Sequence, residues 1–155
     1  MKLQNSKLIL RQLDKKLMAL QPLQDAMPAT GWVNLIRKTL NMSLRQLGDR
    51  LSITPQSIRD IEKREKEGTV SLKALREAAR ALDMTLVYGF IPKDKDGSLE
   101  KMIERKAYEK AQKIVSRTST TMKLEDQGNS KERIKQAVAE LADEIRREMP
   151  KNLWD

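Results

Sequence analysis

The sequence predicts an all-α fold, and three observations support this prediction. Aromatic residues make up only 3% of the 155 residues, whereas the strands of β-sandwiches and barrels favour Tyr, Phe and Trp. Apolar residues, mainly Leu, Ile, Ala and Met, recur at the three- and four-residue spacing of amphipathic helices. Ser or Thr precedes several of these stretches, as expected of helix N-caps.

Residues 1–29 are expected to form an N-terminal helix and a connector. The apolar spacing places the helix between Leu3 and Leu20, and two prolines bracket the connector. One stripe of the helix either packs on the rest of the chain or forms a dimer seam. Two heptads are too few for a stable coiled coil alone, so packing within the chain is favoured. The stripe consists of Leu10, Leu13, Leu17 and Leu20.

Residues 30–92 are expected to hold four short helices and one short strand. The first helix begins near Trp32, and the other three follow the N-caps Ser43, Thr54 and Ser71. Pro55 suits the first position of its helix, which should run to about Glu65 and stop at Gly68. Residues 85–91 are the only strand-like run, so this strand should pair with a symmetry mate or pack as an extended arm.

Residues 98–155 are expected to form a C-terminal helical extension. Ser98 caps a helix whose apolar stripe ends at Val115. The Ser- and Thr-rich residues 116–130 predict a loop, and Ser130 opens a last helix that ends at Pro150.

Composition argues against most enzyme classes. The chain has no Cys and no His, so it lacks thiolate zinc ligands, a cysteine nucleophile, the usual general base and the commonest metal ligand. No Gly-rich phosphate loop is present, and we expect no cofactor, no metal and no catalysis. No apolar run approaches the ~20 residues that span a bilayer, and the polar N-terminus is unlike a signal peptide. We therefore expect a soluble, cytoplasmic protein without a membrane partner.

Positive charge is concentrated in the first part of the chain. The net charge is +9, and residues 30–66 hold eight basic and four acidic residues. Such a basic segment suits either a solvated surface or a polyanionic partner, and nucleic acid comes before membrane.

Residues 43–64 have the spacing of a helix-turn-helix motif. Gly48 supplies the small residue expected where two helices cross closely, and Ile58 and Ile61 supply an inner face for the second helix. This second helix would enter the major groove, where Gln can pair with adenine and Arg with guanine. The predicted base-contacting residues are Gln56, Ser57, Arg59 and Asp60, and the predicted phosphate-contacting residues are Ser43, Arg45, Arg50, Lys63 and Arg64.

The run from Met42 to Glu62 resembles the phage-repressor type of helix-turn-helix, the XRE family, almost position for position. The resemblance implies a lambda-repressor-like domain and a structural ion pair between Arg37 and Glu62. Two positions depart from the family pattern. Leu44 stands where many members have a DNA-contacting Gln, and Ser52 stands where most have Gly in the turn.

A narrower resemblance covers roughly residues 1–115. The order of Gly31-Trp32-Val33, Met42-Ser43, Leu86-Val87-Tyr88 and Ile91-Pro92 is similar to the mobile mystery protein A family. Members of that family accompany a Fic-domain partner in a pairing that looks like a toxin–antitoxin module. The resemblance therefore implies transcriptional autorepression and a Fic-type toxin as protein partner.

Two functions follow as hypotheses. In the first, the chain is a sequence-specific repressor that binds an inverted-repeat DNA operator as a homodimer, because one recognition helix reads only about four base pairs. The predicted dimer seam consists of Leu86, Val87, Tyr88 and Phe90. In the alternative, the chain is an interaction protein that neutralises a partner enzyme through its terminal helices, and DNA binding is secondary.

Overall fold

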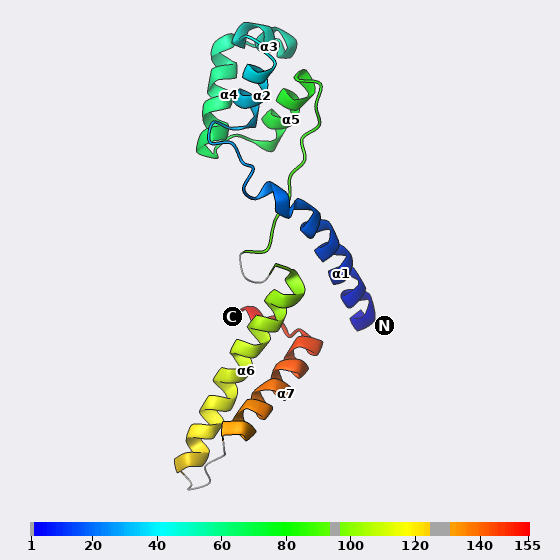
Figure 1. The fold of residues 1–155 in the computed structure, drawn as a ribbon, viewed down its shortest axis with the longest axis vertical. Coiled ribbons are helices and arrows are strands. Elements are labelled where there is room, and N and C mark those ends of the chain that lie inside the picture. The colour runs from blue at the N-terminus through cyan, green and yellow to red at the C-terminus, as the bar shows by residue number, and fades with distance from the viewer. Residues whose placement is uncertain (1, 94–96, 125–130) are drawn as a thin grey trace. The chain divides into compact units, whose positions relative to one another are not determined.

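The computed structural model describes residues 2–93, 97–124 and 131–155 (Figure 1). These residues form seven α-helices and two short 3-10 helices. The chain divides into two compact units. Residues 22–89 form one unit, and residues 1–21 together with residues 90–155 form the other. The N-terminal helix, predicted as part of a separate segment, is thus grouped with the C-terminal helices.

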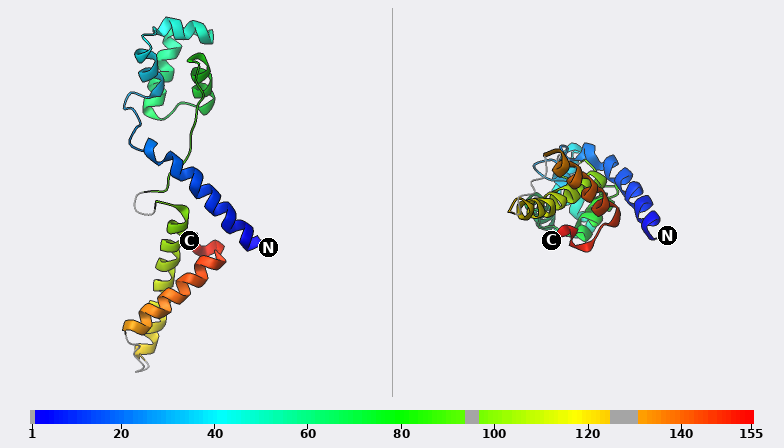
Figure 2. Two further views of the ribbon diagram at one scale, coloured as in Figure 1. Left: turned by 45° about the vertical axis from the view of Figure 1, so that its right-hand side comes forward. Right: turned by 90° about the horizontal axis from the view of Figure 1, so that it is seen from below.

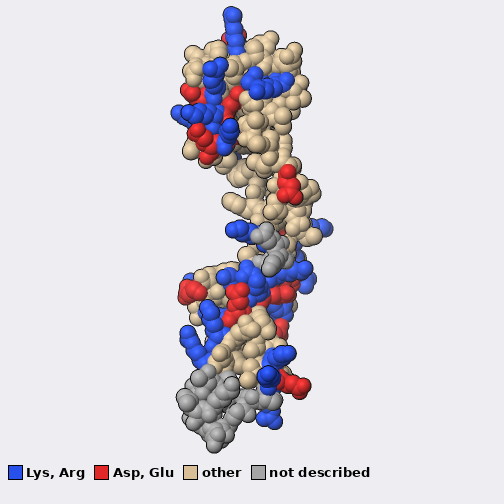
Figure 3. Space-filling view, turned by 60° about the vertical axis from the view of Figure 1, so that its left-hand side comes forward, with Lys and Arg blue, Asp and Glu red and all other residues tan. Residues whose placement is uncertain are grey.

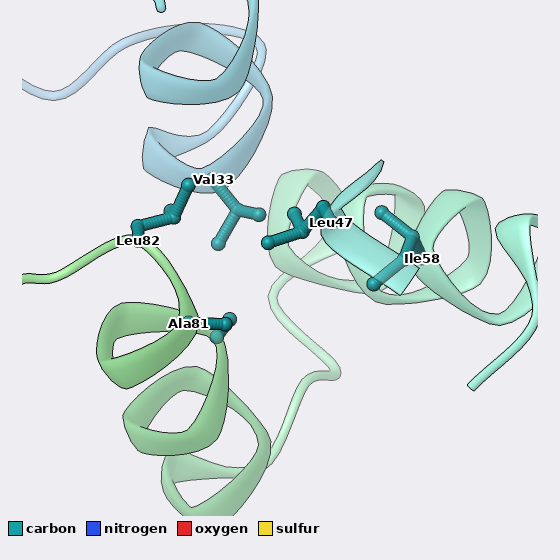
Figure 4. Packing of buried hydrophobic residues seen from close by; sticks show 6 residues of the cluster. Val33, Leu47, Ile58, Ala81 and Leu82 are labelled. Atoms are coloured by element: carbon teal, nitrogen blue, oxygen red, sulfur yellow. The ribbon is translucent and has the colours of Figure 1, made fainter. Parts of the chain in front are cut away.

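The unit of residues 22–89 is a small helical bundle around a single core. Its helices are α2 (Trp32–Thr39), α3 (Leu44–Leu51), α4 (Pro55–Glu67) and α5 (Leu72–Ala81). Figure 4 shows side chains from these helices pointing toward one another, and Leu47 and Ile58 have no exposed surface. The buried members of the core are Val33, Leu47, Ile58, Ala78, Ala81 and Leu82.

The predicted helix ends in this unit are confirmed. The hydroxyl oxygens of Ser43, Thr54 and Ser71 each accept a hydrogen bond from the backbone N–H three residues later. Gly68 ends α4 in the left-handed conformation (φ 79°), which costs glycine little. These caps satisfy backbone groups that helix ends would otherwise leave unpaired.

The second unit is built on a helical hairpin. Helices α6 (Leu99–Leu124) and α7 (Lys131–Glu148) lie side by side in Figures 1 and 2 and share a core with the 3-10 helix η2 (Lys151–Trp154). Helix α1 (Lys2–Leu20) contacts α6, and Leu10 packs against the hairpin core. The buried core residues are Ile103, Ala107, Ala111, Val138, Ile145 and Leu153.

A buried carboxylate joins α1 to the start of α6. Asp14 is only 8% exposed, and its two oxygens accept hydrogen bonds from the backbone N–H groups of Leu99 (2.7 Å) and Glu100 (3.1 Å). Ser98 accepts from the N–H of Lys101 and caps the same helix, as predicted. A negative charge at a helix N-terminus is stabilised by the helix dipole, so Asp14 fixes α1 to α6 both by hydrogen bonds and by charge.

The predicted short strand is not found among the described residues. Residues 84–93 follow α5 without regular secondary structure, and the N–H groups of residues 85–91 donate to no carbonyl of the described chain. The apolar, β-branched composition of this segment predicted a strand, but a strand needs a partner ladder, and nothing described in a single chain offers one.

The loop predicted over residues 116–130 is also wrong in part. Helix α6 continues to Leu124, and residues 125–130, including Ser130, lie outside the described residues. Ser and Thr lower helix propensity by only about 0.5 kcal/mol per residue, too little to end a long helix. The hydroxyl of Thr118 donates to the carbonyl of Ile114 within the helix, so its polar group has a partner there. In the described part of the chain, no helix is long and apolar enough to cross a membrane.

Candidate nucleic-acid interface

Helix α3 is held at its start by a reciprocal capping box. The Ser43 hydroxyl accepts from the Gln46 N–H (3.1 Å), and the Gln46 side-chain oxygen accepts from the Ser43 N–H (2.8 Å). Both donors at the helix start are therefore satisfied locally. This arrangement uses the Ser43 hydroxyl as an acceptor, while the residue stays exposed at the N-terminal end of α3.

The turn between α3 and α4 depends on two unusual backbone positions. A Cβ atom at Gly48 would lie 2.7 Å from the Ile53 carbonyl oxygen, so only glycine fits where the turn passes over α3. Ser52 adopts the left-handed conformation (φ 56°, ψ 39°), at the turn position where the sequence resemblance implies that glycine is usual. The structure thus places Ser52 in the strained conformation that its sequence position implied.

Helix α4 has a clear inner and outer face. Ile58 is fully buried in the core and Glu62 is 7% exposed, whereas the predicted readers Gln56, Arg59 and Asp60 are all exposed. These three readers lie within five residues, on a helix that begins with Thr54 as N-cap and Pro55 at its first position. A rigid helix with a free polar face is what insertion into the major groove requires.

The predicted base-contacting residues differ in how many hydrogen bonds their polar groups already make. The Gln56 amide donates to an Asp60 carboxylate oxygen (3.2 Å), so Asp60 is held by Gln56, four residues earlier. Ser57 is half-buried, its N–H donates to the Thr54 hydroxyl oxygen, and the two hydroxyls lie 2.8 Å apart. Arg59 is exposed, and arginine is the side chain that pairs bidentately with guanine.

A buried ion pair supports the inner face of α4. The Arg37 guanidinium donates to both oxygens of Glu62 (2.5 and 3.3 Å), and the two residues are 8% and 7% exposed. Arg37 also donates to the Met42 carbonyl, and the Asn34 amide donates to Glu62 (each 2.9 Å). Every charge in this group has several partners, so it ties α2 to α4 and fixes the direction of α4.

The candidate phosphate contacts fall into two groups. Arg45, Lys63 and Arg64 are exposed on α3 and α4. Arg50 is also exposed, but its guanidinium contacts residues at the end of α5. Arg50 donates to the Ala81 carbonyl (3.0 Å) and lies 3.3 Å from an Asp83 oxygen. Figure 3 shows Lys and Arg side chains mixed with acidic ones on one side of this unit, beside a larger uncharged area.

The residues predicted for the dimer seam lie just after α5. Leu86 is half-buried, while Val87 (70%), Tyr88 (58%) and Phe90 (82%) are exposed. The Arg76 guanidinium lies 5.9 Å from the centre of the Tyr88 ring, which holds that ring against α5 by a cation–π contact.

Sequence reasoning missed one residue that shapes the unit. Glu65 accepts hydrogen bonds from the N–H groups of Trp32 and Val33 (each 2.9 Å) and so caps α2 from the last turns of α4. Gly31, the residue directly before α2, has no side chain that could cap this helix. A Cβ atom at Gly31 would lie 2.8 Å from a Glu65 oxygen. The one signal in the sequence was a glycine directly before an apolar helix, and the structure gives this Gly31 a positive φ of 87°.

A comparison with known protein families agrees with the helix-turn-helix arrangement of α3 and α4. Residues 34–88 match a family model described as helix-turn-helix. No curated protein and no solved structure matches the chain. Domains of this kind are DNA-binding regulators and are not typically catalysts. Residues 34–88 therefore form an XRE-type helix-turn-helix domain, which supports sequence-specific DNA binding and transcription regulation.

Proposed function

We propose that the protein is a cytoplasmic transcriptional repressor that reads an inverted-repeat operator as a homodimer. The observation that carries this proposal is α4, whose outer face presents Gln56, Arg59 and Asp60 while Ile58 and Glu62 anchor its inner face. The caps of α3 and α4 and the fixed turn between them make this surface rigid before DNA binds, which lowers the entropy cost of recognition.

The proposal assigns different tasks to Arg59 and Lys63. Arg59 reads a base, so Arg59→Ala lowers operator affinity by about 1–3 kcal/mol and relaxes the preference at one base pair in each half-site. Lys63 contacts phosphate, so Lys63→Ala weakens binding to all duplexes alike. It also reduces the salt slope, the slope of log affinity against log salt concentration, by about 1.

Binding-site selection from random duplexes tests this assignment. The wild-type chain, Arg59→Ala and Lys63→Ala are compared in parallel, and folding is checked by circular dichroism. An Arg59→Ala chain that selects the same sequences with the same strength would remove Arg59 from the readers. A wild-type chain that selects no sequence would overturn the proposed function.

The resemblance to the mobile mystery protein A family extends the proposal to a partner. On this proposal the repressor acts on its own operon and binds a Fic-type toxin encoded beside it. Helix α1 supports a protein partner because Leu8, Ile9, Leu13 and Met18 remain more than 40% exposed on it. Exposed apolar side chains of this number on one helix suit a protein contact.

The second candidate function is neutralisation of that partner with DNA binding as a minor activity. The same exposed side chains on α1 favour it. Co-expression with the adjacent gene product, followed by purification of the chain with and without Ile9→Lys, separates the two candidates. If the Ile9→Lys chain no longer co-purifies with the partner but selects the same operator, α1 binds the partner and α4 binds DNA. A chain that co-purifies with its partner but selects no operator favours neutralisation alone.

A further inference from the structure

Helix α6 carries a row of positive charges that the helix-turn-helix domain does not explain. Lys106, Lys110, Lys113 and Arg117 follow one another at spacings of four, three and four residues. At 3.6 residues per turn these positions fall within about 60° of arc, along roughly 16 Å of helix. We call these four residues the basic stripe. They line a shallow hollow of about 220 Å³ with Leu153 and Asp155 of the C-terminal segment.

The basic stripe lies on the flank of α6 and leaves the buried face intact. Ile103, Ala107 and Ala111 face the hairpin core and are at most 5% exposed. Lys113 and Arg117 are exposed, and Lys106 and Lys110 are half-buried where they line the hollow. The core thus fixes the rotation of α6 and aligns the four cations on one side.

The hollow is lined by more basic than acidic residues. Glu109 is the acidic residue of α6 that lines the hollow, and it lies nearer to Arg105 (3.1 Å) than to Lys106 (3.9 Å). Lys110 donates to the backbone carbonyl of Asn152, which carries no charge. Among the residues that line the hollow, four are basic and two, Glu109 and Asp155, are acidic. Such a surface attracts a polyanion.

We infer that the basic stripe of α6 is a second DNA-contacting surface, which binds backbone phosphates without reading sequence. The inference rests on the proposed DNA-binding function, which brings a polyanion to the chain. Duplex DNA presents one negative charge per about 1.7 Å of its axis, so a row of cations along about 16 Å of helix faces many phosphates. Point charges on flexible lysine stems suit such contacts, which need little geometric precision.

The test compares two full-length variants that remove the same charge. The stripe variant carries Lys106→Gln, Lys113→Gln and Arg117→Gln and keeps Lys110, whose contact with Asn152 closes the C-terminal segment on α6. The control variant carries Lys101→Gln, Lys131→Gln and Lys135→Gln, three exposed positions of the same unit away from the hollow. Circular dichroism and thermal melting confirm that both variants are folded.

Affinity for the selected operator and for a scrambled duplex is then measured by fluorescence anisotropy over a range of salt concentrations. We expect the stripe variant to reduce the salt slope by about 0.9 for each phosphate that is no longer neutralised, so up to about 2.7, on both duplexes. Its preferred sequence stays the same. The control variant should change the slope much less.

Equal slopes for the stripe variant, the control and the wild type would overturn the inference. So would a stripe variant that keeps its DNA slope but no longer binds an acidic protein partner, because the stripe would then serve protein binding. Failure of the inference leaves wild-type operator selection intact. Failure of the proposed function removes that selection altogether, so the two outcomes are distinguishable.

Discussion

Glu65, on the last turns of α4, caps helix α2, and Gly31 is the residue that leaves room for its carboxylate. One carboxylate accepts both the Trp32 and Val33 N–H groups at 2.9 Å. Its oxygen occupies the space in which a Cβ atom at position 31 would lie, at 2.8 Å. The start of α2 and the last turns of α4 are therefore joined by the Glu65 carboxylate, and the missing side chain of Gly31 leaves room for it.

Glu65→Gln should destabilise the domain by about 1–2 kcal/mol, because an amide offers one acceptor oxygen to two backbone donors and carries no charge toward the helix dipole. The free energy of unfolding in urea measures this change. Glu67→Gln, which removes the same charge from an exposed position of the same helix, is the matched control. Equal stability of the two variants would show that the cap contributes nothing.

Glu62→Gln should have a larger effect. The variant leaves the Arg37 guanidinium buried without a counter-charge, which costs about 3–5 kcal/mol. Glu109→Gln breaks an exposed ion pair with Arg105 and should cost less than about 1 kcal/mol. The stability of the two variants is compared by their midpoints of unfolding in urea. A Glu62→Gln chain as stable as wild type would contradict the structural role of the pair.

Gly48→Ala should also destabilise the chain, although alanine is the better helix former by about 1 kcal/mol. The added methyl would lie 2.7 Å from the Ile53 carbonyl oxygen, so the turn must shift. Crowding of this kind costs about 1–3 kcal/mol beyond the propensity gain. Thermal melting shows whether the Gly48→Ala chain is less stable or more stable than wild type. Asp49→Ala, on the exposed side of the same helix, should be neutral or slightly stabilising, and a similar result for Gly48→Ala would argue against a tight turn.

The accuracy of the sequence-based predictions depended on how local the responsible interactions are. The N-caps Ser43, Thr54 and Ser71 were predicted correctly because a cap and its helix are neighbours in sequence. The capping carboxylates Asp14 and Glu65 were missed because they act across 85 and 33 residues. A carboxylate at such a distance looks like any surface charge until the fold places it beside a helix end.

The two wrong assignments have related causes. Residues 116–124 were predicted as loop from Ser and Thr content, but propensity is a weak signal once a helix is long. Residues 85–91 were predicted as a strand from their composition, but strand formation depends on a partner that a single sequence does not reveal. For the candidate site, the outer face of α4 followed from helical spacing, whereas the engagement of Arg50 with Ala81 and Asp83 did not.

The segment after α5 leads to a prediction about dimerisation. Its backbone N–H groups at residues 85–91 have no carbonyl partner in the described chain, and Val87, Tyr88 and Phe90 are exposed. An antiparallel pairing of two copies would satisfy these groups and cover the apolar side chains. Such a pairing would also give the two-fold symmetry that an inverted-repeat operator requires.

Val87→Pro should therefore yield a monomer with weak operator binding, because proline removes a donor and cannot continue a paired strand. Val87→Thr keeps the N–H group and the β-branched shape, and it should remain dimeric with nearly wild-type affinity. Light scattering gives the oligomeric state of each variant, and operator titration gives its affinity. If Val87→Pro stays dimeric and still binds its operator, the seam lies elsewhere. The exposed apolar side chains of α6, Tyr108 (46%) and Ile114 (42%), would then be the next surface to test, because a helical hairpin can form a two-fold interface without any strand.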